Sequence, residues 1–328
     1  TVLEVTKEIK QVPPPSLFNF NDLARTMNRR YGYFVDATYE IAQRLYEEHK
    51  LITYPRTDSN YIKESMIEDI NEVLKCNKFG KFSALICDIK SLDNFIDRTV
   101  DDKKVEEHTA IVPIHNEHAP DVYKDLGEKE KAVYDEILLN FISNFGEDYK
   151  YESIRVITEV TKYKFITNDQ RVINHGWRSV YKDIKEASEV NIGGIKIGEK
   201  LNVANVSLTS KYTMPPERYS DDTLLEVLEN PAKLVEEKNL KSIIKKCGIG
   251  TNATRSGVIS DLLNDGYVIR EKKYFRPTIE GQELIKSIEI DELKKPHFTA
   301  DIEKKLQEIS EGKLDKDELI KKIIKFTS

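Results

Sequence analysis

The hydrophobic pattern of the chain changes its period twice, and this restricts the fold to separate helical and β-rich parts. Up to about residue 145, apolar residues recur every three or four positions, which predicts amphipathic helices over 21–30, 36–46 and 127–143. From Ser153 to Thr167, β-branched and aromatic residues with period-two stretches predict strands. The helical period returns at Asp221. Because 328 residues exceed the usual size of one hydrophobic core, we expect a multidomain α+β protein.

Turn and capping residues refine this division in the first half of the chain. Residues 1–12 are predicted to form a short strand, which ends at the stiff run Pro13-Pro14-Pro15. Asp36 is expected to cap the second helix, and Ser59 or Asn60 to cap a third. The apolar face of that third helix would carry Ile62, Met66, Ile70 and Leu74.

Glycine and proline clusters set boundaries in the second half. Gly193-Gly194 predicts a turn beside strands around 195–197 and 201–203. Met214-Pro215-Pro216 ends this β-rich block and marks a domain boundary near residue 216.

The C-terminal region has the pattern of a winged helix. A helix over 252–264 should end at Gly266, and two short strands around a charged turn at 271–273 should follow it. Thr278 would then open another helix. Helix, short loop, helix and two-stranded wing is the layout of a winged-helix DNA-binding unit.

Composition limits the class of protein. Lys and Arg total 51 against 57 Asp and Glu, a net charge of -6 that argues against non-specific coating of nucleic acid but permits a local basic groove. The three cysteines form no CxxC pair, so we expect neither a disulfide framework nor a zinc site. No apolar run is long enough for a membrane span and the N-terminus has no signal layout, so we expect a cytoplasmic protein.

The run Leu51-Ile52-Thr53-Tyr54-Pro55-Arg56-Thr57-Asp58-Ser59 concentrates reactive side chains on a short connector between two predicted helices. Pro55 holds the backbone, and Arg56 lies close enough to contact whatever Tyr54 contacts. The three residues after Arg56 supply caps at a helix N-terminus, whose free N–H groups suit a phosphate. From spacing alone, a tyrosine and a proline that pack a helix corner are the commoner interpretation.

The chemistry of these side chains is nevertheless specific. A tyrosine phenol, with an ordinary pKa of about 10, is a poor nucleophile at neutral pH unless a nearby cation lowers that pKa. Arg56 can do so, and it can also hold the negative charge that builds on a phosphate oxygen during displacement. A phosphotyrosine would keep the energy of a broken DNA bond, so the strand could be resealed without a cofactor.

The run from Ile52 to Ser59 is similar to the active-site signature of type IA DNA topoisomerases. With Pro55 in it, the run resembles the signature of the topoisomerase III branch more closely. Upstream, Asn28-Arg29-Arg30-Tyr31-Gly32-Tyr33 and Ala42-Gln43-Arg44-Leu45-Tyr46 resemble the two helices that precede the tyrosine in that family. The resemblance implies that Tyr54 is the nucleophile, with Arg56 as its catalytic partner and Thr57, Asp58 and Ser59 as DNA contacts.

Further motifs follow in the family's order. Glu107-His108-Thr109-Ala110-Ile111-Val112-Pro113 resembles a segment whose histidine touches the scissile phosphate, a role that maps onto His108. Judged alone, such a histidine is more often an ordinary surface or core residue. Gly248-Ile249-Gly250-Thr251-Asn252-Ala253-Thr254-Arg255 resembles a second family motif, and we expect Thr251 and Arg255 to contact the DNA backbone. Without the family, a plain helix–helix turn is an equally good interpretation of this run.

One departure from the family matters. Type IA enzymes begin with a Toprim domain that supplies a catalytic Glu, a Lys and an Asp cluster for Mg²⁺, and no part of this chain resembles it. We therefore expect a fragment that is inactive alone, with no metal site of its own and with the Mg²⁺ ligands in the missing domain. The start at Thr1, without Met and within an apparent strand, is consistent with this expectation.

The resemblance also implies an architecture and partners. Residues 1–15 and 146–215 would form a β-rich arch, 16–145 a helical domain that carries the tyrosine, and 216–328 a winged-helix-like base domain. We expect a monomer that binds single-stranded DNA, and the resemblance is compatible with a helicase as a partner. Two other functions are compatible with parts of this pattern: a non-catalytic single-stranded DNA-binding module, and a tyrosine recombinase. The recombinase would need a His-x-x-Arg upstream of a late tyrosine, which the sequence lacks.

Overall fold

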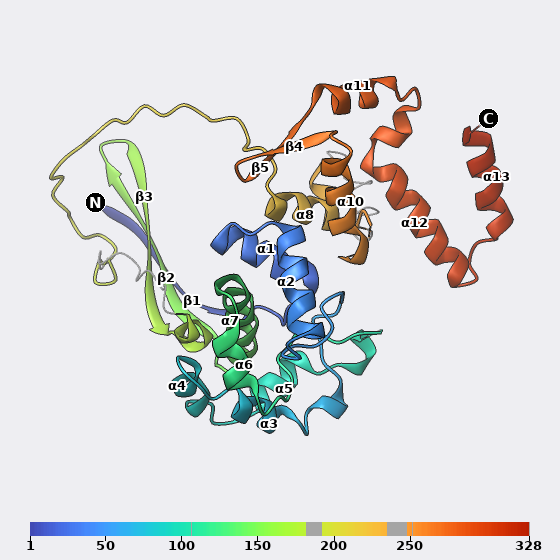
Figure 1. Ribbon diagram of the computed structural model, residues 1–328. Helices are drawn as coiled ribbons and strands as arrows, with labels where there is room; N and C mark the ends of the chain where they lie inside the picture. Colours follow the sequence, from blue (N-terminus) through green and yellow to red (C-terminus); the bar gives the residue numbers. More distant parts are fainter. Residues whose placement is uncertain (106, 182–191, 235–247, 251, 328) are drawn as a thin grey trace. The chain divides into compact units, whose positions relative to one another are not determined.

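The computed structural model describes the chain except for residues 106, 182–191, 235–247, 251 and 328 (Figure 1). The chain forms two compact units and passes between them several times. The first unit contains Thr1–Phe18, Leu45–Thr53 and Ser59–Pro215. The second contains Asn19–Arg44, Tyr54–Asp58 and Pro216–Ser328. The α+β content expected from the two changes of period is present, and each unit is described below by itself.

A three-stranded antiparallel sheet belongs to the first unit, in the order β1 (Val2–Val12), β2 (Tyr149–Val160) and β3 (Tyr163–Asn174). Figure 1 draws the three as long neighbouring ribbons. The strands predicted over 1–12 and within 153–167 are confirmed. The β2–β3 hairpin extends beyond the stretch in which apolar residues alternate. The sheet buries a small cluster of Val2, Ile154, Val156 and Ile192.

The strands predicted around 195–197 and 201–203 are wrong. Main-chain hydrogen bonds from Ile195 N to Ile192 O (3.2 Å) and from Glu199 N to Lys196 O (3.1 Å) fold the first stretch into turns. Residues 199–219 then run without regular secondary structure. Val203 is 56% exposed and Leu208 97% exposed, so this stretch has an alternating pattern but pairs with no strand among the described residues.

Short helices surround the long helix α7 in the first unit. They are α3 (Ile70–Cys76), α4 (Phe82–Cys87), α5 (Asp93–Thr99), α6 (Ala119–Asp125) and α7 (Glu128–Ser143), with 3-10 turns at Glu64–Met66, Asp102–Lys104 and Gly176–Val180. Phe95 of α5 stacks on Phe145 with ring centroids 4.3 Å apart, and Phe141 of α7 packs edge-on against both. The predicted helix over 127–143 is confirmed.

The helix predicted directly after Ser59 is wrong. Residues 56–63 contain no helix, and α3 begins only at Ile70. The expected caps bond elsewhere: Ser59 Oγ donates to Lys104 O at 3.1 Å, and Asn60 Nδ2 donates to Leu17 O at 2.6 Å. These long-range bonds hold the chain extended where its apolar spacing suggested a helix.

The second unit is mainly helical. Its elements are α1 (Phe20–Tyr31), most of α2 (Val35–Glu47), α8 (Asp221–Glu229), α10 (Asn252–Asn264), β4 (Val268–Glu271), β5 (Tyr274–Pro277), α11 (Ile279–Ser287), α12 (Pro296–Ser310) and α13 (Lys316–Thr327), with 3-10 turns at Pro231–Leu234 and Asp291–Lys294. Asn19 caps α1, because its side chain accepts from Asp22 N at 2.8 Å. Asp36 was predicted as the α2 cap but is the second residue of that helix.

Ion pairs connect the helices of this unit. Arg25 of α1 lies 3.0 Å from Asp222 and 3.2 Å from Glu229, both on α8. Arg270 of β4 lies 2.8 Å from Asp221, whose side chain is fully buried. Burial raises the pKa of Asp221 although Arg270 acts in the opposite direction.

The predicted order of helix, two-stranded hairpin and helix is observed in α10, β4–β5 and α11. Gly266 follows α10 with a φ of +74°, which favours glycine. Thr278 caps α11 by accepting from Gly281 N at 3.1 Å. Across the described parts of both units, no helix is long and apolar enough to cross a membrane.

Candidate active site

The segment Tyr54–Asp58 is a loop anchored to the start of α1. Phe20 N donates to Thr57 O at 3.1 Å, and Thr57 N donates to Pro55 O at 3.0 Å. Pro55 and Thr57 are buried, Tyr54 is half-buried, and Arg56 and Asp58 are exposed. The loop therefore alternates supporting side chains with side chains that reach solvent.

Arg56 is held by an aromatic ring. Its guanidinium carbon lies 4.6 Å from the centre of the Tyr39 ring on α2, and Tyr39 packs edge-on against Phe20 at 5.6 Å. A cation over a ring face keeps its charge and its N–H donors at the ring edge available to an anion. The stack thus restricts the position of Arg56 and leaves its charge exposed.

Arg255 organises the turn before α10. Its side chain donates to Ile249 O (3.0 Å) and Gly250 O (2.9 Å) and lies 3.8 Å from Glu229. Burial lowers the pKa of Arg255, and the nearby Glu229 and Asp58 act to raise it. Because Arg255 is only 8% exposed, its visible role is to shape the turn. Thr251 lies outside the described residues.

Both glycines of this turn suit its close contacts and its backbone conformation. A Cβ on Gly248 would lie 2.4 Å from Arg255 Nη2 and 3.1 Å from Leu228 O. Gly250 has a φ of +66°, a conformation that other residues rarely adopt. The turn therefore brings its main chain close to the Arg255 guanidinium.

The first unit contains the other two predicted residues. His108 has a side chain that is 44% exposed, with Nε2 3.9 Å from Glu107 Oε2. Ser59 is buried, and its hydroxyl donates to main-chain carbonyls. The predicted set thus divides between units: Ser59 and His108 in the first, and Tyr54, Arg56, Thr57, Asp58 and Arg255 in the second.

Two residues near the candidate site were not singled out from the sequence. Thr53 makes three hydrogen bonds to residues 110–112, and Tyr39 carries the Arg56 stack. The only sequence signal for Thr53 was its place beside Tyr54. Tyr39 had no signal beyond its position on a predicted helix.

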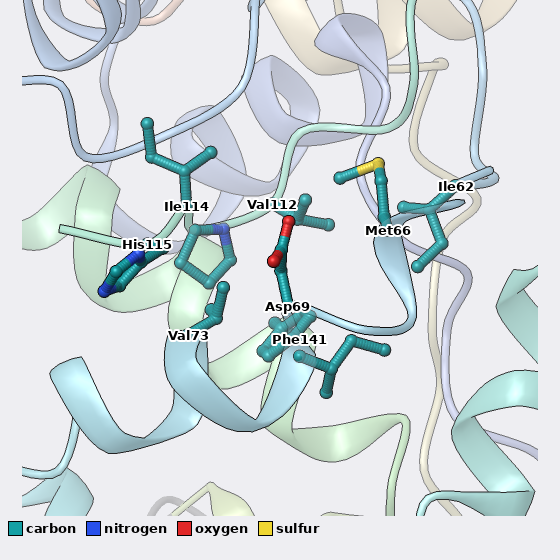
Figure 2. Close-up of a pocket in the computed structure, with 10 residues that line it drawn as sticks. Ile62, Met66, Asp69, Val73, Val112, Ile114, His115 and Phe141 are labelled. Atoms are coloured by element: carbon teal, nitrogen blue, oxygen red, sulfur yellow. The ribbon is translucent and has the colours of Figure 1, made fainter. Parts of the chain in front are cut away.

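A small cavity of about 70 Å³ lies in the first unit beneath residues 112–115 (Figure 2). Its lining is mostly apolar, including Ile62, Val112 and Phe141, with Asp69 and His115 as polar members. Apolar walls do not suit a phosphate, so we do not assign the chemistry to this cavity. Within the described residues, no three His, Cys, Asp or Glu side chains gather closely enough to hold a metal ion.

Known proteins resemble this chain in both structure and sequence. The structure is similar to that of full-length topoisomerase I from Thermotoga maritima, with a TM-score of 0.71 and 24% identity over 99% of this chain and 51% of that one. A family model described as DNA topoisomerase matches residues 1–321. The chain therefore belongs to the DNA topoisomerase family.

The most similar relatives include topoisomerase III enzymes. The chain is 33% identical to DNA topoisomerase 3 of Bacillus thuringiensis strain Al Hakam, over 100% of this chain and 46% of the relative. It is 32% identical to DNA topoisomerase 3 of Bacillus subtilis, over 98% of this chain and 45% of the relative. The resemblance to the type IA, topoisomerase III-like branch is confirmed, and the chain spans about half the length of these relatives.

Proposed function

We propose that this chain provides the strand-cleaving tyrosine of a type IA, topoisomerase III-like enzyme, and that Tyr54 is that tyrosine. The observation that carries the proposal is the Tyr54–Asp58 loop, in which a half-buried tyrosine stands two residues from a ring-supported, exposed arginine. The family match over residues 1–321 supports it.

The proposed reaction is a transfer of one phosphodiester bond. The Tyr54 oxygen loses its proton and attacks a DNA phosphorus, while the bond from that phosphorus to the 3′ oxygen breaks. The 5′ phosphate stays on Tyr54, and the 3′ oxygen leaves as a hydroxyl after it takes up a proton. The reverse transfer reseals the strand, so no external energy source is consumed.

Two cationic or polar side chains are proposed to assist. Arg56 would hold the charge that builds on a non-bridging phosphate oxygen, and His108 would contact the same phosphate. Mg²⁺, when bound by the enzyme, would supply further positive charge near the phosphate. We expect its ligands in a Toprim domain, as the family resemblance implies.

We propose that DNA follows the exposed parts of the loop and the turn before α10. Asp58 is exposed, whereas Thr57 and Ser59 are buried, so the latter two would act through the shape of the loop and its main chain. Thr251 and the turn that Arg255 organises would contact the sugar–phosphate backbone without reading bases.

In terms of domains, we propose that residues 16–145 form the tyrosine domain, 1–15 and 146–215 the arch, and 216–328 the base. The substrate would be single-stranded DNA, bound by a cytoplasmic monomer, and a helicase would be a compatible partner. Passage of a second strand through the gap would relax or decatenate DNA.

The proposal is tested by adduct formation. An end-labelled single-stranded oligonucleotide and Mg²⁺ are mixed with the chain, with and without a separately produced Toprim domain from a topoisomerase III, and the label on denatured protein is measured. We expect an adduct only when the Toprim domain is present, and none with Tyr54→Phe. Binding without any adduct would favour a single-stranded DNA-binding module, and an adduct retained by Tyr54→Phe would exclude Tyr54 as nucleophile.

A further inference from the structure

Thr53, the residue before Tyr54, is tied to the segment that follows His108. Its N–H donates to Val112 O at 2.9 Å. Its hydroxyl donates to Ala110 O at 2.7 Å and accepts from Val112 N at 3.0 Å. One threonine thus supplies three hydrogen bonds to a stretch that begins two residues after His108.

The surroundings make this tether rigid. Ile52 forms an antiparallel bridge with Pro113, and Ile114 N donates to Leu51 O at 3.1 Å. Leu51, Ile52 and Ala110 are fully buried, and Ile111 N donates to Phe18 O at 2.7 Å. Residues 51–53 and 110–114 therefore form a short pairing that is buried at Leu51, Ile52 and Ala110 and half-buried at Thr53.

The hydroxyl has a specific task in this pairing. In an antiparallel pair, opposed residues normally exchange bonds through both the N–H and the C=O of the main chain. At Thr53, the side-chain hydroxyl oxygen accepts the hydrogen bond from Val112 N in place of the Thr53 main-chain carbonyl. Both hydrogen bonds of the Thr53–Val112 pair therefore form without that carbonyl. The main chain can therefore turn away at Tyr54 directly after a closed pair.

We infer that Thr53 is a positioning residue for strand cleavage: it fixes the backbone that precedes Tyr54 to the backbone that follows His108. This inference rests on the proposed roles of those two residues. Without the hydroxyl, the buried Val112 N–H loses its acceptor, and Ala110 O loses the hydrogen bond that it accepts from Thr53. An unsatisfied buried N–H is costly, which favours rearrangement of the pairing. A displacement of about 1 Å at a reacting group costs on the order of a hundredfold in rate.

The first experiment compares Thr53→Val, which has the same shape without the hydroxyl, with Thr53→Ser, which keeps the hydroxyl. The rate of adduct formation is measured in the Toprim-supplemented protein at saturating oligonucleotide, together with oligonucleotide affinity. We expect Thr53→Val to slow the rate by about tenfold to a hundredfold with affinity nearly unchanged. Thr53→Ser should restore most of the rate.

A matched control separates positioning from general damage to the core. Thr99 lies in the same unit, is 1% exposed, and its hydroxyl donates to Phe95 O at 2.7 Å. Thr99→Val should leave the adduct rate close to that of the unaltered chain. An equal loss in Thr99→Val and Thr53→Val, or no rescue by serine, would overturn the inference.

The second experiment needs no cleavage activity. Hydrogen exchange of the Val112 amide is followed in the 328-residue chain alone, where Thr53→Val should accelerate it and Thr99→Val should not. Unchanged exchange in Thr53→Val would overturn the tether itself. Accelerated exchange, combined with an adduct that persists in Tyr54→Phe, would instead confirm the tether and refute the role proposed for Tyr54.

Discussion

The two halves of the tyrosine motif are held by different forces. Leu51–Thr53 belongs to the first unit, where Leu51 and Ile52 are fully buried and main-chain hydrogen bonds pair the segment with 110–114. Tyr54–Asp58 belongs to the second unit, where the Thr57 carbonyl accepts from Phe20 and Arg56 stacks on a ring. Burial of Leu51 and Ile52 fixes the geometry of the first half, whereas the second half leaves Tyr54 half-buried and Arg56 exposed. The supporting residues and the candidate reactive residues are therefore adjacent in sequence but belong to different units.

The largest expected effect tests the exposed half. If Arg56 has its proposed role, Arg56→Ala should reduce adduct formation in the Toprim-supplemented protein by about a hundredfold to a thousandfold, because that role is to hold the charge on the phosphate. Affinity for the oligonucleotide should fall much less. Arg276→Ala is the matched control, since Arg276 is an exposed arginine of the same unit. Equal losses of rate and affinity in Arg56→Ala would make Arg56 a simple binding residue.

The second prediction tests the buried half. Ile52→Ala should lower the free energy of unfolding by about 3 kcal/mol, because it leaves a cavity in a fully buried pairing. Ile166→Ala, at a side chain of the same unit that is 56% exposed, should change it by less than about 0.5 kcal/mol. Denaturant unfolding of the two variants measures the difference. A similar small effect in both would mean that burial does not hold this half.

The third prediction concerns pH and the charged interior of the second unit. Because burial raises the pKa of Asp221 in the folded protein, Asp221 favours folding most below its unfolded pKa, and this contribution is lost as pH rises through the folded pKa. The free energy of unfolding of the unaltered chain minus that of the Asp221→Asn variant should therefore decrease as pH rises from the unfolded pKa of Asp221 to its folded pKa. A difference that stays constant, or that increases with pH, would contradict the raised pKa.

Local patterns predicted several elements, including β1, whose partner strand β2 begins only at Tyr149. The period of apolar residues identified α1 and α7, and glycine and charged residues marked the β4–β5 hairpin, because the main-chain hydrogen bonds of each element are made within its own stretch. The chain after Ser59 was mispredicted because Ser59 and Asn60 bond to residues 45 and 43 positions away. A local period cannot report such partners.

The same limit applies to the candidate site. Tyr54 and Arg56 belong to one short motif, so their spacing and the chemistry proposed for them could be inferred from the sequence. Thr53 pairs with Ala110 across 57 residues, and Tyr39 meets Arg56 only after α2 has folded. The sequence identified Arg255 as a cation but did not predict that its side chain is buried beneath the turn. The candidate side chains could therefore be named from the sequence, while the contacts that support them depended on tertiary structure.

The smallest expected effect tests whether Tyr39 supports Arg56. Tyr39→Leu removes the ring beneath the guanidinium and should slow adduct formation by about threefold to fivefold, the effect of an exposed cation–π contact. Tyr39→Phe keeps the ring and should retain nearly the full rate. In an Arg56→Ala background, Tyr39→Leu should have no further effect, because the pair acts through one charge. An undiminished effect in that background would mean that Tyr39 acts through the packing of α2 against Phe20, and the exposed half of the motif would then also depend on burial.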